Sequence, residues 1–79
     1  MFNLMVDSKH LVAKVLNIKG EMVKQYPKYL ITNMETFKVL RNTKHYRSAT
    51  DSFGSVIPTV CDLRVVIDND LLYGEVEVR

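Results

Sequence analysis

Two pairs of carboxylates lie close together near the end of the chain: Asp68 and Asp70, then Glu75 and Glu77. Carboxylates at this spacing can ligate a divalent cation or act as an acid–base pair. A calcium loop starting at Asp68 needs an oxygen ligand at its fifth position and a glycine at its sixth. Leu72 and Tyr73 occupy those positions. Because Asn69 and Asp70 are typical turn residues and Gly74 tolerates positive φ, the segment is predicted to be a turn.

A nucleophilic site is also poorly supported. Cys61 is the single cysteine, and His10 and His45 are the two histidines that could activate it. Asp62 follows Cys61 in an alternating strand pattern and would raise the thiol pKa, so we expect a small buried residue. The serines match no nucleophile motif, and the glycines are too scattered for a phosphate loop. The sequence therefore predicts no enzyme, no metal site and no cofactor.

A basic segment is the stronger candidate for binding. It holds Lys38, Arg41, Lys44, His45, Tyr46 and Arg47, and no acidic residue lies between Glu35 and Asp51. Such side chains can neutralise phosphates and stack on bases, which is the nucleic-acid alternative. The same residue types in a long loop can anchor a protein partner. A net charge of +2 lacks the basic excess typical of nucleic-acid-binding domains. Protein binding is therefore the favoured interpretation.

The composition bounds the remaining possibilities. At 79 residues and 47% hydrophobic content, the chain is predicted to be a single domain over residues 1–79 with a thin core. Residues 1–50 hold nine Lys or Arg against three acidic residues, whereas residues 51–79 hold two against six. This asymmetry can mark an interaction face or let the two halves attract each other. One cysteine, no signal peptide and no long apolar run predict a cytoplasmic protein without membrane contact.

The apolar spacing predicts the elements. Residues 2–6 suggest an edge strand or lead-in, and Asp7 or Ser8 can cap a helix over residues 8–25, which Pro27 ends. Gly20 weakens this helix by about 1 kcal/mol relative to alanine and can divide it into two pieces. Residues 28–32 are expected to form a strand, and residues 34–41 a helix capped by Asn33 or Thr32, with Met34, Phe37 and Leu40 facing the core. Residues 42–52 are predicted to be a loop.

The last third of the sequence alternates with period two. Leu63, Val65 and Ile67, and later Val76 and Val78, are expected to face the core. These two strands are predicted to form a C-terminal antiparallel β-hairpin, while the strand near residue 30 can pair in parallel with the strand that contains Val65. The predicted fold class is α+β, with two helices packed on one face of a small mixed β-sheet.

Two segments together carry a resemblance to a known family. "KYLITNMETFKVLR" and "FGSVIP…DLRVVIDNDLLYGEVEV" resemble the axial-domain section of the tailed-phage major capsid fold, and are similar to small phage open reading frames with that unit. The resemblance covers residues 28–79. It implies a phage or prophage origin. The chain lacks the long spine helix and extended arm of a shell subunit, so no capsid role follows.

These observations favour a small non-enzymatic phage-type protein that binds a host or viral protein as an accessory, adaptor or inhibitor. Nucleic-acid binding through residues 38–47 is the alternative. Self-association through the open edge of the terminal strand would give a homo-oligomer. Leu71 and Leu72 are adjacent in the predicted turn. They either fold back on the core or stand exposed as a second contact.

Overall fold

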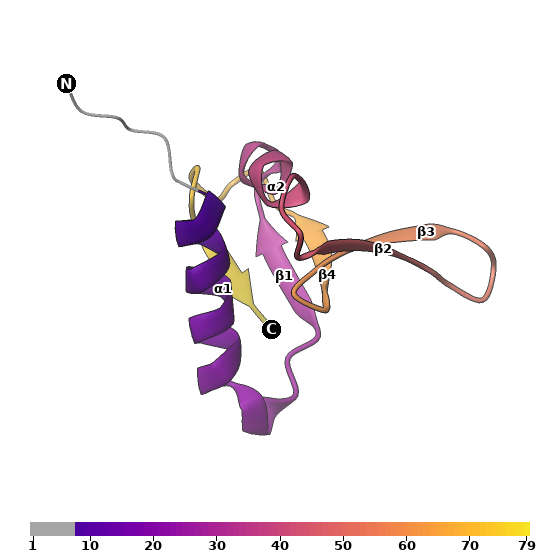
Figure 1. Cartoon of the computed structure of the whole chain (residues 1–79), viewed down its shortest axis with the longest axis horizontal. Helices are drawn as coiled ribbons and strands as arrows, with labels where there is room; N and C mark the ends of the chain where they lie inside the picture. Colours follow the sequence, from indigo (N-terminus) through magenta and orange to yellow (C-terminus); the bar gives the residue numbers. More distant parts are fainter. Residues whose placement is uncertain (1–7) are drawn as a thin grey trace.

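The computed structural model describes residues 8–79; the predicted strand over residues 2–6 and the Asp7 cap lie outside the described residues. The described elements are α1 (Ser8–Glu21), a 3-10 turn η1 (Val23–Gln25), β1 (Tyr29–Thr32), α2 (Met34–Arg41), β2 (Tyr46–Thr50), β3 (Val56–Val60), β4 (Leu63–Ile67) and β5 (Val76–Val78). Figure 1 shows two helices beside a sheet from which β2 and β3 project. The α+β class with a mixed sheet is confirmed.

Helix α1 buries one stripe and ends earlier than its apolar spacing predicted. Leu11, Val12 and Val15 are buried, as their spacing requires. The α-helix ends at Glu21 because the N–H of Met22 is shared between two carbonyls, those of Ile18 and Lys19, at 3.1 Å each. Such sharing tightens the last turn into the 3-10 segment η1. The helical region predicted over residues 8–25 is therefore two pieces, with the break just after Gly20, the residue expected to weaken the helix.

Helix α2 has the predicted bounds and the predicted cap. The Asn33 side-chain oxygen accepts a hydrogen bond from the Thr36 N–H at 2.7 Å, which satisfies one of the free amides of the first turn. Phe37 and Leu40 are buried. Met34, which was also expected to face the core, is 41% exposed. It is the first helical residue, and its N–H bonds the side chain of Asn69 instead.

The strand order of the sheet is β2-β3-β4-β1-β5, so β1 lies between β4 and β5. It pairs with β4 in parallel and with β5 in antiparallel fashion, so that Leu30 lies between Val65 and Val78. The parallel pairing is confirmed, but the predicted C-terminal hairpin is wrong. The connection over residues 68–75 is long enough to cross β1, and β5 therefore pairs with the free side of β1 rather than with β4.

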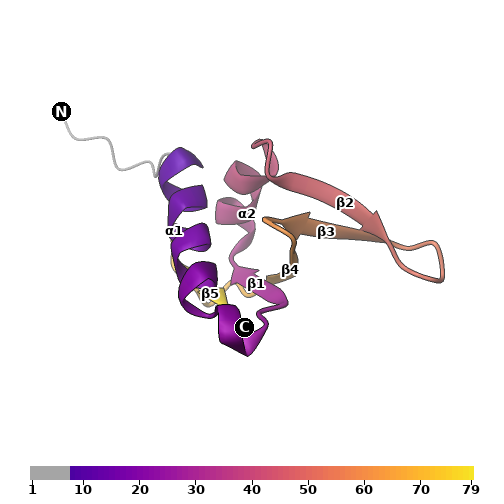
Figure 2. The same ribbon diagram turned by 60° about the horizontal axis from the view of Figure 1, so that its bottom comes forward.

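The core lies between the helices and one face of the sheet. Both helices lie on the same side of the strands in Figure 2. Leu11, Leu30, Leu40 and Leu63 are completely buried. Each such leucine contributes about 1.5–3 kcal/mol relative to an exposed one. The remaining inward positions of β4 and β5 are those that the alternation predicted: Val65, Ile67, Val76 and Val78.

Strands β2 and β3 form a projecting antiparallel ribbon where a loop over residues 42–52 was predicted. The ribbon aligns Arg47 with Thr59 and Ala49 with Ile57. All β2 residues after Tyr46 are exposed. A strand exposed on both faces has no alternation of apolar and polar residues, which explains why the sequence pattern missed it. In Figure 1 the ribbon projects beyond the rest of the described residues.

A two-residue turn joins β3 to β4. Its residues, Cys61 and Asp62, have φ values of 53° and 65°. Two left-handed residues in succession are typical of the type I′ turn, which matches the twist of paired strands. The expectation that Cys61 lies inside a strand is therefore wrong. Cys61 is still buried, as expected.

Candidate protein-binding site

The acidic residues of the β4–β5 connection hold their own backbone. The Asp68 carboxylate accepts the Asp70 N–H at 3.0 Å, and the Glu75 carboxylate accepts the Leu72 N–H at 2.7 Å. Gly74 has a φ of 85°. The turn interpretation is thus confirmed. Over residues 8–79, no group of three or more His, Cys, Asp or Glu side chains is placed to hold a metal ion.

The same connection is bonded to the start of α2. The Asn33 side-chain amide donates to the Leu71 carbonyl at 3.1 Å, and the Gly74 N–H donates to the Thr36 hydroxyl at 2.9 Å. These bonds turn Leu71 partly into the protein, whereas Leu72 is 71% exposed. The two predicted contact residues therefore separate: Leu72 remains available to a partner, and Leu71 is half-buried.

Cys61 is placed for packing rather than for nucleophilic chemistry. Burial raises the pKa of its thiol, the nearby Lys19 ammonium lowers that pKa, and the Asp62 carboxylate raises it again. Lys19 also donates to the Cys61 carbonyl at 2.7 Å. His45 meets Cys61 through the backbone, because its carbonyl accepts the Cys61 N–H at 3.1 Å. A thiol whose pKa is raised is a poor nucleophile at neutral pH.

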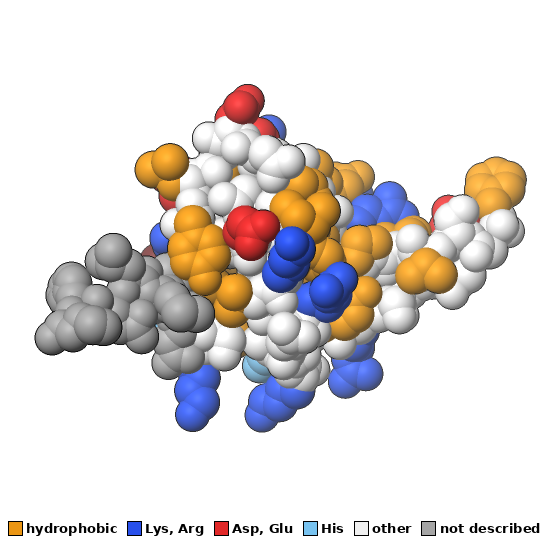
Figure 3. Space-filling view, turned by 90° about the horizontal axis from the view of Figure 1, so that it is seen from above, with side chains coloured by type: hydrophobic (Ala, Val, Ile, Leu, Met, Phe, Trp, Pro, Cys, Tyr) orange, Lys and Arg blue, Asp and Glu red, His pale blue; other side chains and the backbone are white. Residues whose placement is uncertain are grey.

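The predicted basic site is distributed over α2, the α2–β2 connection and β2. Lys38 pairs with Glu35 at 3.4 Å, and the Arg41 guanidinium lies 5.9 Å from the centre of the Phe37 ring. Tyr46 packs edge-on against the same ring, with 6.1 Å between the ring centres. Tyr46 is therefore a packing residue rather than a free anchor. Arg47 is exposed on β2. Lys and Arg side chains line the lower margin of Figure 3.

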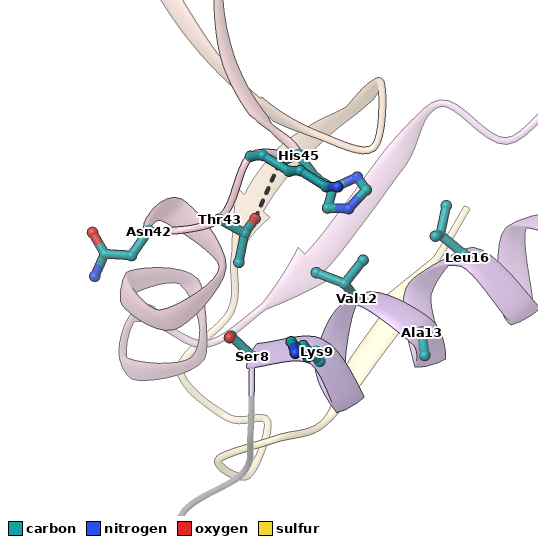
Figure 4. A pocket seen from close by; sticks show the side chains of 9 residues that line it. Ser8, Lys9, Val12, Ala13, Leu16, Asn42, Thr43 and His45 are labelled. Carbon is teal, nitrogen blue, oxygen red and sulfur yellow. Dashed lines mark hydrogen bonds between the residues drawn. The ribbon is translucent and has the colours of Figure 1, made fainter.

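Lys44 and His45 line a groove between α1 and the α2–β2 connection (Figure 4). The groove has a volume of about 450 Å³. Its apolar wall is made by Val12, Ala13 and Leu16 of α1. The opposite wall is held in place because the Thr43 hydroxyl accepts the His45 N–H at 3.3 Å. Sequence reasoning missed the groove, because it joins residues 8–16 to residues 42–45 across the tertiary fold.

The ribbon ends in a turn built by Asp51. Its carboxylate accepts the N–H groups of Phe53 and Ser55, both at 2.9 Å, and its carbonyl accepts the Gly54 N–H at 3.1 Å. Gly54 has a φ of 82°, which favours glycine. This turn leaves Phe53 92% exposed. Phe53 was not selected from the sequence, and the signal that could have found it is an aromatic residue beside a turn glycine.

Comparison with known proteins found no matching family model, no matching curated protein and no matching solved structure. Among the described helices, neither has the length and apolar content required to cross a bilayer.

Proposed function

We propose that the protein acts by binding another protein, and that the ribbon of β2 and β3 is its main binding element. The observation that carries this proposal is the exposure of Phe53, at 92%, and of Val56, at 70%, on an ordered projecting element. Aromatic side chains, phenylalanine among them, are enriched in the cores of protein–protein interfaces. The Asp51 bonds fix the turn in advance, which lowers the entropy that binding would cost.

The proposed biological role is that of a non-enzymatic accessory, adaptor or inhibitor in a phage or prophage setting. The partner would be a host or viral protein in the cytoplasm. Support for the phage setting comes from the resemblance of residues 28–79 to the axial-domain section of the capsid fold. Support for binding comes from the ribbon and from the exposed Leu72 of the β4–β5 connection.

Affinity purification can test this function. The tagged chain would be recovered from cells that express it, and bound proteins would be quantified by mass spectrometry. Phe53→Ser should reduce recovery of a specific partner at least tenfold, a loss of about 1.4 kcal/mol. Tyr26→Ser is the matched control, because Tyr26 is 79% exposed and lies outside the ribbon. Equal partner recovery by Phe53→Ser and the wild type would refute the role of the ribbon.

Nucleic-acid binding through residues 38–47 is the second candidate, and the absence of acidic residues between Glu35 and Asp51 favours it. The ribbon itself carries Arg47 as its one cation, against Asp51, so it brings few phosphate contacts. If this basic segment binds nucleic acid, affinity should fall steeply with salt because counterions are released. A gel-shift titration with a short duplex at two salt concentrations tests this, and Arg41→Ala with Lys44→Ala should weaken the shift.

A further inference from the structure

Strand β2 is the open edge of the sheet at the ribbon side. Two backbone hydrogen bonds at the ends of its ladder with β3 show which residue pairs are hydrogen-bonded. The Asp51 N–H donates to the Ser55 carbonyl, and the Cys61 N–H donates to the His45 carbonyl. Antiparallel ladders alternate between hydrogen-bonded and non-hydrogen-bonded pairs. Arg47 and Ala49 therefore bond to β3, whereas Ser48 and Thr50 direct their N–H and C=O groups to the open edge.

The other edges are less suited to pairing. On β3, Pro58 lies opposite Ser48 and has no N–H to offer at the outer side of the ribbon. Strand β5 spans three residues, and very short edge strands are a common protection against pairing. The open part of β2 contains no proline and carries one charge, that of Arg47. It is thus the better template for an added strand.

We infer that this edge binds β2 of a second copy of the chain in antiparallel fashion, with Phe53 of each copy entering the groove of the other. The inference rests on the proposed protein-binding role of the ribbon and names its partner. In the register centred on Ala49, Ser48 of one copy bonds to Thr50 of the other. This register joins the exposed amide and carbonyl groups at both positions in four hydrogen bonds.

Charge complementarity selects this register. It places Arg47 of one copy directly opposite Asp51 of the other, twice by symmetry, and leaves the small Ala49 pair at the centre. Opposite charges facing each other across strands stabilise a pairing, whereas like charges destabilise it. If the pairing were instead centred on Arg47, two positions earlier, the two Arg47 guanidinium groups would face each other.

The same register explains the groove and the exposed ring together. Antiparallel pairing brings the turn at residues 51–55 of the second copy, which carries Phe53, to the base of the first ribbon. At that base His45 lines the groove beside Val12, Ala13 and Leu16. The ring is 92% exposed in the single chain, and the groove offers about 450 Å³ with an apolar wall. Pairing would therefore bury the two Phe53 rings and add main-chain bonds at the same time. The interface is isologous and closes as a dimer.

Sedimentation velocity over a range of concentrations tests the dimer. We expect a concentration-dependent dimer that Ser48→Pro and Phe53→Ser each weaken at least tenfold, while Tyr26→Ser leaves it unchanged. Ser48→Pro removes an N–H that points away from β3, so the ribbon should keep its own ladder. Circular dichroism would verify that each variant remains folded. Arg47→Glu should also weaken the dimer, because it sets two carboxylates against each other.

Disulfide trapping tests the register independently of any loss of stability. Non-hydrogen-bonded antiparallel pairs have Cα atoms about 4.5 Å apart, within the range that a disulfide spans. Ala49→Cys should therefore form a covalent dimer on mild oxidation. Val56→Cys, which is 70% exposed on the neighbouring strand, is the control and should remain monomeric. Cys61 is buried in the wild-type chain, so it should not take part in either cross-link.

A monomer at millimolar concentration would overturn the inference, as would a dimer that Ser48→Pro leaves unchanged and Ala49→Cys does not trap. Different results would refute the proposed function and the proposed dimer. A foreign protein whose recovery depends on Phe53, found with a chain that sediments as a monomer, refutes the dimer and retains the binding role. A dimer with no other partner retains the inference and limits the binding role to self-association.

Discussion

Replacement of Asn33 tests how the β4–β5 connection stabilises the fold. Its side chain makes two bonds with different partners: the oxygen accepts the Thr36 N–H at 2.7 Å, and the amide donates to the Leu71 carbonyl at 3.1 Å. Loss of an N-cap costs about 1 kcal/mol. Loss of a donor to a part-buried carbonyl costs about 1 kcal/mol more. Asn33→Ala should therefore lower the free energy of unfolding by about 2 kcal/mol.

A second variant separates the two bonds. Asn33→Asp keeps an acceptor for Thr36, and a carboxylate is favoured at a helix N-terminus, but it removes the amide donor to Leu71. We expect a loss of about 1 kcal/mol for this variant at neutral pH. For a domain of this size, 1 kcal/mol corresponds to about 4–8 °C in Tm. The Ala variant should therefore melt about 8–16 °C below the wild type and the Asp variant about half as far.

Thermal and urea unfolding followed by circular dichroism would measure both differences. Asn17→Ala is the control, because Asn17 is exposed on α1, and a change within about 0.5 kcal/mol is expected there. An Asp variant as stable as the wild type would refute a stabilising bond to the connection. An Asp variant as unstable as the Ala variant would refute the contribution of the cap.

Four further predictions each concern a single position. Asp62→Gly should raise the free energy of unfolding by about 0.5–1 kcal/mol in urea melts, because φ is 65° there and glycine adopts it without strain. Alkylation of Cys61 should be slower than that of free cysteine at pH 8, since burial raises the pKa of its thiol. The stability that the buried neutral thiol contributes is present at neutral pH and is lost as the pH rises through the folded-state pKa. Tyr46→Ala should cost about 2–3 kcal/mol through its Phe37 contact, and Arg47→Ala less than about 0.5 kcal/mol, by the same melts.

Elements whose signals are local were predictable from the sequence. Helix α2 has the expected bounds, because its cap at Asn33, the first-turn Glu35 and the apolar spacing all lie within one short segment. The inward alternation of β4 was equally clear. The pairing partner of β5 was not predictable, because a turn at residues 68–75 is compatible with a hairpin and with a crossing connection. Tertiary bonds from Asn33 and Thr36 accompany the second arrangement.

The candidate site was less predictable than the fold. The basic segment was visible from its charges. The sequence did not show that Tyr46 packs against the hydrophobic core or that Lys38 pairs with Glu35. The groove and the exposed Phe53 depend on how α1 and the ribbon are placed in space. Residue type and spacing carry no such information for segments about 30 residues apart.

The position of β1 also has a kinetic consequence. Both of its partners, β4 and β5, come from more than 30 positions further along the chain, whereas the β2–β3 and β3–β4 pairs join neighbours. Strands that are neighbours in the sequence pair quickly. Strands that are far apart in the sequence must first overcome the entropic cost of closing a long loop. We therefore expect residues 30–32, the buried part of β1, to find their partners last. During that interval they form an unpaired apolar edge, and refolding at high concentration should lose protein to aggregation through it.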